Sequence, residues 1–319
     1  MLAIGIAAAV HAHAQTAAPP PPRVVIVSGG TEESFREFRD SFVQGMRQLG
    51  HAEGRTFRLE VLYANREPTR TPALIQQAVA TRTDVLVVAG LTAASRARDA
   101  TKTVPVVVAT SSDLVDAGIV ESMAHPGSNI TGLTDLADEA TVKRLEFLKE
   151  MLPKASHVAL LNNPDFPATP KIENRVGAAA RTLGISVTRL YARDRASLSL
   201  ALDSLEKLRP DALLLGGDAL FTNNARQLID RATVLRVPVV HYWPGTAEMG
   251  ALFSHQADIH GNYKRTAFYV DRILKGAKPG DLPIEQPTRY ELVINRKAAA
   301  AFGIALPQVT LLRADRVIE

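Results

Sequence analysis

Two stretches of this sequence show the same succession of patterns, and this internal repeat restricts the possible folds more than any other feature. In the first, Asp84 to Asp113, an apolar run of Val and Leu ends at Gly90, a polar helical segment follows, and a second apolar run comes next. The second, Asp211 to Val240, again reads as strand, helix and strand. A chain that repeats one α/β unit at this length is expected to form two similar lobes with a cleft between them.

The apolar runs of both stretches are continuous rather than alternating, which is typical of parallel strands covered by helices on both faces. We therefore predict an α/β fold with two similar doubly wound, parallel-sheet lobes. In such sheets ligands bind beyond the carboxyl ends of the strands. The likeness between the halves also extends upstream: Arg23 to Val27 matches His157 to Leu161, Leu49-Gly50 matches Leu183-Gly184, and Leu62 to Ala64 matches Leu190 to Ala192.

Composition limits the classes of function that fit. A length of 319 residues suggests two domains, and 46% hydrophobic with 22% charged residues is ordinary for globular proteins. The 37 basic residues are interspersed with 33 acidic ones, so we expect no nucleic-acid partner. The chain has no cysteine, which excludes disulfides, cysteine-ligated zinc, thiol catalysis and a lipid anchor on an N-terminal cysteine.

The N-terminus reads as a secretory signal. Leu2 to Val10 is a short apolar run, and Ala12-His13-Ala14 has the small residues of a cleavage site, so we expect cleavage near Ala14. The usual positive segment is missing, which suggests a start codon further upstream; the alternative is a low-complexity tail. Thr16 to Pro22 reads as a proline-rich linker, and the folded part is expected to begin at Arg23. No apolar run approaches the roughly 20 residues of a membrane span.

The order of the patterns also predicts the division into lobes. We expect crossings between the lobes near Leu133 to Leu136 and within Lys278 to Pro287. Residues 1–22 are assigned to the signal and linker, 23–134 with 251–286 to lobe 1, and 135–250 with 287–319 to lobe 2. Between Asp113 and Met123 the spacing of apolar residues predicts a helix, and Val309 to Arg313 is expected to hold a strand or turn.

Motifs that would indicate catalysis are missing. The sequence contains no G-x-S-x-G nucleophile elbow, no G-x-x-x-x-G-K-[ST] phosphate loop and no G-x-G-x-x-G dinucleotide fingerprint. Ser28 to Thr31 is a glycine turn after the first strand; it has some likeness to a phosphate loop, or it is a plain turn in which Thr31 or Ser34 caps the next helix. His255 and His260 lack the spacing of metal ligands. We therefore predict no catalytic residue, no metal and no cofactor.

Polar residues at the predicted strand ends are the candidate binding residues. Asp113 and Asp218 each follow an apolar run and precede a helical segment, so each either caps a helix or binds the cationic end of a ligand. Ser28, Thr31, Thr92, Ser111, Ser112 and Asn163 also stand at strand ends. Hydroxyl groups and free backbone N–H groups at helix starts would suit a ligand carboxylate. Together these groups match an amino acid.

Aromatic residues make up only 5% of the chain, yet three of them stand at predicted strand exits. Tyr242 is followed by Trp243, the single tryptophan, and Phe221 lies at another exit. Facing a cleft, they would stack on a planar or apolar ligand. The alternative is a structural role in the core, where tryptophan is largely buried anyway.

Several motifs resemble one known family. The segments are His125-Pro126-Gly127-Ser128-Asn129-Ile130-Thr131-Gly132, similar to R-P-G-G-N-I-T-G; Ile273 to Pro279, similar to I-L-x-G-A-K-P; Leu282 to Thr288, similar to L-P-V-E-Q-P-T; and Glu291 to Asn295, similar to F-x-L-V-I-N. The chain resembles the ABC-transporter substrate-binding proteins of the tryptophan/tyrosine type over essentially the whole mature chain. It departs from the family at His125, at Ser128, and at Ser112-Asp113-Leu114, where a T-D-P or G-D-P turn is usual.

The resemblance implies a type 1 periplasmic binding fold with three crossings, in which a hinge closes two lobes on a small solute. It implies a periplasmic monomer that takes up an aromatic or other amino-acid-like compound and delivers it to an ABC permease in the inner membrane. A sensory receptor domain for the same kind of ligand is one alternative. An enzyme on a related two-lobed fold is another, and it would require turnover and a phosphate site.

Overall fold

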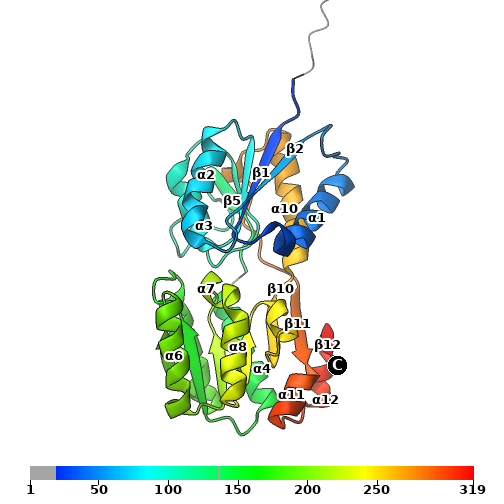
Figure 1. Ribbon diagram of the computed structural model, residues 1–319. Coiled ribbons are helices and arrows are strands. Elements are labelled where there is room, and N and C mark those ends of the chain that lie inside the picture. Colours follow the sequence, from blue (N-terminus) through cyan, green and yellow to red (C-terminus); the bar gives the residue numbers. More distant parts are fainter. Residues whose placement is uncertain (1–18, 136) are drawn as a thin grey trace, which may run out of the picture.

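The computed structural model describes residues 19–135 and 137–319 and has two α/β lobes, one above the other in Figure 1. The predicted signal segment and Leu136 lie outside the described residues. Within these ranges, the first sheet has the strand order β2-β1-β3-β4-β5 and is entirely parallel. Its strands are β1 Arg23–Ser28, β2 Arg58–Tyr63, β3 Val85–Val88, β4 Val106–Val108 and β5 Ile130–Gly132. The helices of this lobe are α1 Glu32–Gln48, α2 Thr71–Ala80, α3 Leu91–Ala100 and α10 Ile259–Leu274, with short 3-10 turns at Pro68–Arg70 and Pro279–Asp281.

The second sheet has the order β12-β11-β10-β9-β8-β6-β7. Its strands are β6 His157–Asn162, β7 Ser186–Tyr191, β8 Ala212–Leu215, β9 Val239–His241, β10 Phe253–Ala257, β11 Tyr290–Asn295 and β12 Arg316–Ile318. The helices are α4 Ala137–Met151, α5 Thr169–Leu183, α6 Arg195–Leu208, α7 Ala219–Asn223, α8 Ala225–Val234, α9 Pro244–Glu248, α11 Arg296–Phe302 and α12 Gln308–Leu312. The order β7-β6-β8-β9-β10 reproduces β2-β1-β3-β4-β5, so the predicted pair of similar doubly wound lobes is confirmed.

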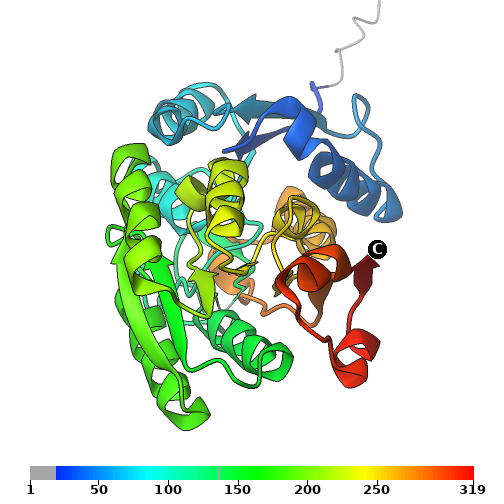
Figure 2. The same ribbon diagram turned by 60° about the horizontal axis from the view of Figure 1, so that its bottom comes forward.

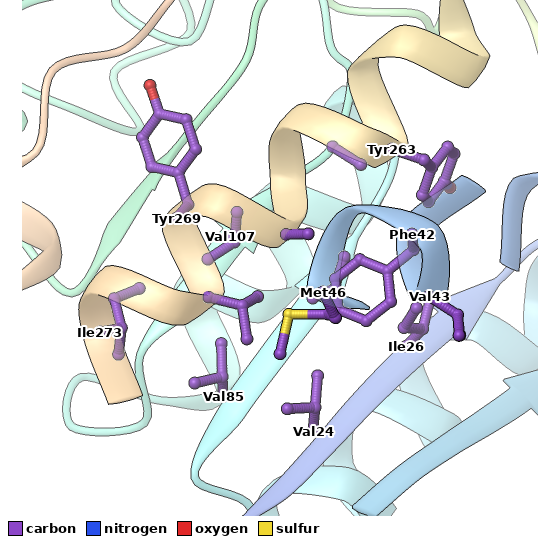
Figure 3. Close-up of a cluster of buried hydrophobic side chains, with 14 of the residues drawn as sticks. Val24, Ile26, Phe42, Val43, Met46, Val85, Val107, Tyr263, Tyr269 and Ile273 are labelled. Atoms are coloured by element: carbon purple, nitrogen blue, oxygen red, sulfur yellow. The ribbon is translucent and has the colours of Figure 1, made fainter. Parts of the chain in front are cut away.

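The continuous apolar strands are buried on both faces because alternate side chains enter different cores. Val24 and Ile26 of β1 point into the core beneath α1 and α10, while Val25 and Val27 point into the core beneath α2 and α3. Figure 3 shows the first of these cores, where Phe42 of α1 lies among side chains of the sheet and of α10. The second lobe repeats this arrangement, with one core beneath α4 and α5 and another beneath α6 and α8.

Helix α10 returns to the first lobe and packs directly on α1. The backbone carbonyl of Lys264 would lie 2.6 Å from a Cβ atom placed on Gly45, so the two helices meet where α1 has no side chain. Phe35 of α1 makes an edge-to-face contact with Tyr263 of α10, with ring centroids 5.3 Å apart. This contact attaches a segment that is distant in sequence to the first lobe.

The chain crosses between the lobes at three places. Backbone hydrogen bonds join the first and the second crossing to the third. The amide of Thr134 donates to the carbonyl of Glu285 at 2.9 Å, which ties the first crossing to the third. The second crossing follows β10, where the amide of Asp258 donates to the carbonyl of Arg289 at 3.0 Å. The three connecting segments therefore run side by side at the junction between the lobes.

Some predicted elements are corrected by the structure. Residues 251–257 were expected in lobe 1, but β10 pairs with β9 and β11 and so lies in the second sheet. β11 runs antiparallel to β10, because the chain re-enters this sheet from the other lobe. The helix predicted after Asp113 is replaced by turns over residues 114–124, where Gly118 has a φ of 63°. Val309 to Arg313 lies mostly in α12, and the terminal strand is β12, at the red end of the chain in Figure 2.

Candidate functional site

The carboxyl edges of the two sheets face each other. Residues that follow strands of the first lobe contact residues that follow strands of the second: the amide group of Asn223 donates to the carbonyl of Arg66 at 3.4 Å, and Lys171 forms an ion pair with Asp113. Figure 1 shows α7 at the edge of the second lobe nearest to the first. The predicted binding residues are therefore distributed on both sides of one junction, as expected for strand ends in two opposed sheets.

The first strand end in lobe 1 is occupied by helix capping. The Oγ1 atom of Thr31 accepts the amide of Ser34 at 3.2 Å, and the Oγ atom of Ser34 accepts the amide of Thr31 at 2.9 Å. The buried Ser28 accepts the amide of Gly30 at 3.1 Å. This reciprocal capping box satisfies donors at the start of α1, which is the plain-turn alternative to a phosphate loop.

The next two strand ends of lobe 1 leave polar groups available. Gly90 precedes α3 and supplies no side-chain cap, while Thr92 in the first turn of α3 is exposed. Ser112 and Ser111 follow β4 and are buried. Within the described residues the Oγ atom of Ser111 has no hydrogen-bond partner. An uncapped helix start after one strand and an unsatisfied hydroxyl group after the next strand both favour a negatively charged or hydrogen-bonding group.

Asp113 has three contacts that hold its carboxylate. Its Oδ1 atom accepts the amides of Val115 and Asp116 at 3.0 and 3.2 Å, which caps the turn that replaces the predicted helix. Its Oδ2 atom lies 3.3 Å from the Nζ atom of Lys171 in α5. The carboxylate thus already has a cation from the opposite lobe, and its capping role is the one that the structure displays.

Asp218 differs from Asp113 because its partners are neutral. Its Oδ1 atom accepts the amide of Leu220 at 2.7 Å and so caps α7, and its Oδ2 atom accepts from the side-chain amide of Asn163 at 3.1 Å. In the described part of the chain, no lysine, arginine or histidine forms an ion pair with it. Burial raises the pKa of Asp218, with hydrogen bonds from Leu220 and Asn163 acting in the opposite direction.

Of the predicted aromatic residues, two are partly exposed and one is buried. Tyr242 is partly exposed and shares a hydrogen bond of 2.7 Å with the Oγ1 atom of Thr222; burial raises the pKa of its phenol to about 12. Trp243 is also partly exposed and precedes α9, with its ring over Gly245. Phe221 is fully buried in the core beneath α6 and α8. The expected contact between Phe221 and a ligand is therefore corrected: its side chain fills the core.

Arg144 and Asp135 are charged residues near the junction that were not predicted. Arg144 is only 1% exposed; its guanidinium donates to the carbonyl of His255 at 2.9 Å and to the Oγ1 atom of Thr141 at 2.6 Å. Burial lowers the pKa of Arg144 to about 10, while the negative charge of Asp135 opposes this change. Asp135 lies in the first crossing, where its Oδ2 atom accepts from the hydroxyl of Thr110 at 3.1 Å.

A signal for Arg144 was present in the sequence. The apolar positions Leu145 and Leu148 recur at helical spacing, and Arg144 adjoins this stripe, a placement that is unusual for arginine unless it has partners. For Asp135 no comparable local pattern exists. Its position follows from the first crossing between the lobes, which brings its side chain to Thr110.

The histidines lie apart from these strand ends or inside the fold. His255 is buried and stacks on Tyr290 with ring centroids 5.4 Å apart, whereas His260 is exposed beside Phe38. Among the described residues, no group of three histidine or acidic side chains is placed to hold a metal ion. No helix in that part of the chain combines the length and the apolar character needed to cross a membrane.

Comparison with known proteins decides the family. A family model described as ABC transporter substrate binding protein matches residues 24–318, nearly all of the described chain. The chain belongs to this family of ABC transporter substrate-binding proteins. The resemblance found in the sequence motifs is therefore confirmed.

Individual relatives of this substrate-binding protein agree with that assignment. A tyrosine-binding protein from Clostridioides difficile (strain R20291) is 23% identical over 273 residues, which cover 85% of this chain and 78% of the relative. A conserved domain protein from Vibrio cholerae is 27% identical, with a TM-score of 0.85 over 93% of this chain and 99% of that one. The ABC domain from Streptococcus pneumoniae, solved in complex with L-Trp, is 22% identical, with a TM-score of 0.83 over 92% of this chain and 100% of that one. The predicted type 1 periplasmic binding fold is confirmed.

The junction of this substrate-binding protein carries groups of complementary chemistry. The second lobe contributes Asp218, an acid that pairs with no cation of residues 19–135 and 137–319, beside the amide of Asn163. The first lobe contributes the uncapped start of α3 and the hydroxyl groups of Thr92 and Ser111. A carboxylate accepts hydrogen bonds from an ammonium group, and helix N-termini favour a carboxylate. The second lobe thus favours a positively charged group, and the first lobe favours a negatively charged group, of a molecule placed between them.

Proposed function

We propose that this substrate-binding protein binds an amino acid with an aromatic side chain between its two lobes and delivers it to a membrane permease. In this proposal the mature protein acts in the periplasm after removal of the predicted signal at Ala14. Asp218 binds the ammonium group of the amino acid. The start of α3, with Thr92 and Ser111, binds its carboxylate, and Trp243 with Tyr242 contacts its ring.

The proposal depends most on Asp218, whose carboxylate is partly buried and is bound by neutral donors. A carboxylate with a pKa raised by burial is costly to keep ionised unless a positive group approaches it. Its two hydrogen-bond donors, from Leu220 and Asn163, are neutral, so the site retains a place for a cation. The ammonium group of an amino acid provides that cation.

The position of the aromatic pair supports the choice of side chain. Tyr242 follows β9 directly, and Asp218 follows β8, its neighbour in the sheet. A negative charge at Asp218 contributes to the raised pKa of Tyr242, which places the phenol and the carboxylate in one electrostatic environment. The ligands named for the Clostridioides and Streptococcus relatives, tyrosine and L-Trp, are of the same class.

The test is to identify the solute that the purified protein carries. The mature chain, beginning at Gln15, is denatured after gel filtration, and the released small molecules are analysed by mass spectrometry. We expect an aromatic amino acid, recovered chemically unchanged after incubation with native protein. A solute of another class would contradict the proposed ligand, and conversion to a product would favour an enzyme instead.

A further inference from the structure

A single lysine joins the two lobes beside the proposed site. Lys171 lies in the first turn of α5, which belongs to the second lobe. Its ammonium group is 3.3 Å from the Oδ2 atom of Asp113 and also pairs with Asp116. Both carboxylates belong to the turn after β4 in the first lobe. The ammonium group therefore connects the lobes without being part of the three crossings.

The same lysine also balances negative charge within its own lobe. The Nζ atom of Lys171 is 3.6 Å from the Oδ2 atom of Asp138, in the first turn of α4. Asp138 is 5% exposed and is further bound by the Nε atom of Arg175 at 3.0 Å. Without Lys171, two carboxylates of the first lobe would face a buried carboxylate of the second. Arg175 would still pair with Asp138, but no cation would then join the carboxylates of the two lobes, so the loss of this lysine would favour separation of the lobes.

An apolar contact accompanies the ion pairs. Phe166 lies in the loop between β6 and α5, just before Lys171, and packs against apolar clusters of both lobes. In the first lobe this cluster includes Leu114, Ile119 and Val120 from the turns that follow Asp113. Phe166 thus makes an apolar contact, and Lys171 a charged contact, with the turns that follow β4 in the first lobe.

We propose that Phe166 and Lys171 form a latch that stabilises the closed arrangement of the lobes and thereby raises ligand affinity without contacting the ligand. Rotation of the lobes away from each other separates Lys171 from Asp113 and Asp116 and exposes the ring of Phe166. Lys171 is a positioning residue, because it sets the population of the closed arrangement. The inference rests on the proposed function only in placing the ligand between the lobes.

The latch is tested first in the ligand-free protein by distance measurement. The chain contains no cysteine, so fluorophores are attached at Arg82→Cys and Lys207→Cys, exposed positions in the first and second lobe. We expect Lys171→Gln to shift the distribution of interlobe distances to larger values, and Phe166→Ala to do the same. Lys154→Gln, an exposed lysine of the second lobe, is the matched control and leaves the distribution unchanged.

Charge reversal separates a latch from a merely structural lysine. Lys171→Glu increases the opening further, and adding Asp116→Lys restores the closed population, because the pair is re-formed with opposite signs. The difference between Lys171→Gln and the parent protein disappears at about 1 M salt, where charges are screened within roughly 3 Å. Unchanged distances in Lys171→Gln, or no recovery in the reversed pair, would overturn the latch.

Affinity provides the second readout, with L-tyrosine and L-tryptophan as the probes. We expect Lys171→Gln to weaken binding by about two- to fivefold, the range of a partly exposed ion pair. Binding by the parent protein together with equal affinity of Lys171→Gln would overturn the latch alone. If neither amino acid binds the parent protein, the proposed function fails, while the ligand-free distance measurement still decides for or against the latch.

Discussion

The carboxylate of Asp218 caps a helix and also lies at the junction between the lobes. As the cap of α7 it must accept a hydrogen bond from Leu220, and at the junction between the lobes it lies where burial raises its pKa. A cap alone is satisfied at the surface of a protein, and an amide would serve it almost as well. The partial burial of this carboxylate is the reason that we propose a cationic ligand for it in addition to its capping role.

For this reason we predict that Asp218→Asn weakens binding of an amino acid at least tenfold, or about 1.4 kcal/mol, while the folded structure remains. The asparagine retains a capping oxygen but has no charge for the ammonium group. Titration calorimetry measures the change. Asp230→Asn, at an exposed position of α8, is the control and is expected to bind like the parent protein.

The same carboxylate predicts a pH dependence of binding. Its raised pKa means that, as the pH falls, Asp218 takes up a proton above the ordinary value of 3.8 and loses its attraction for an ammonium group. Affinity should thus decrease on acidification before ordinary aspartates titrate. Measured from pH 7 to pH 4, this decrease should be missing in Asp218→Asn; an equal decrease in both proteins would assign it to another group.

The aromatic residues permit a second comparison, between a ligand contact and a core contact. Trp243→Ala is expected to reduce affinity at least tenfold with little loss of stability, because the indole is partly exposed. Phe221→Ala is expected to cost about 3–5 kcal/mol of stability, because its ring is fully buried. Thermal unfolding and titration of both variants separate the two effects. A large loss of stability in Trp243→Ala with unchanged binding would show that the tryptophan is structural.

At the level of elements, the attachment of α10 to the first lobe depends on Gly45. A methyl group there would lie 2.6 Å from the carbonyl of Lys264, closer than packing allows. We predict that Gly45→Ala destabilises the protein by about 1–3 kcal/mol, measured by urea unfolding, because α10 must move away. Gly177→Ala in α5 meets only the far end of Arg189 at 3.8 Å and is expected to stabilise by about 0.5–1 kcal/mol. Equal effects of the two substitutions would contradict this packing argument.

Local patterns in the sequence were sufficient for most elements. The repeated strand, helix and strand pattern predicted β3, α3 and β4 in the first lobe and β8, α8 and β9 in the second, and β1 begins at Arg23, where the folded part is expected to start. The short run at Val309 was ambiguous, since its residues suit a strand as well as one helical turn, and contact between α12 and α4 accompanies the helix. Whether such a short run forms a strand or a helical turn depends on its packing against distant residues, which the local sequence does not show.

Local sequence patterns did not predict which distant segments pair with one another. β10 lies beside β9 in the second sheet, whereas α10, which follows β10 in the chain, packs in the first lobe. The predicted return of the chain to the first lobe at residue 251 is therefore some residues too early. Similarly, the role of Asp113 depends on Lys171, which the fold brings to it from the opposite lobe. The motif resemblance predicted the family because it compares the whole chain, whereas individual site residues require the fold.

For the whole molecule, buried histidines make stability depend on pH. Burial, together with the charge of Arg144, lowers the pKa of both His241 and His255 to about 3. Both are neutral in the folded protein, while in the unfolded chain they take up protons below their ordinary value of 6.5. The unfolded state then binds more protons, so the free energy of unfolding falls as the pH decreases from 6.5, by up to about 1.4 kcal/mol per pH unit for each histidine.

Thermal unfolding between pH 7 and pH 4.5 measures this dependence. We expect a smaller decrease in melting temperature for His241→Gln and for His255→Gln than for the parent protein, because each variant lacks one titrating ring. His125→Gln, at an exposed position, is the matched control and should follow the parent protein. A decrease of the same size in all four proteins would attribute it to carboxylates.

The proposed binding of an aromatic amino acid between the opposed strand ends of the two lobes can be measured directly. Calorimetric titration of the mature, ligand-depleted protein with L-tyrosine and L-tryptophan tests it most directly. We expect binding of one molecule per chain for at least one of the two, with a negative heat-capacity change from burial of the aromatic ring. Absence of binding by both amino acids to the folded protein would contradict it.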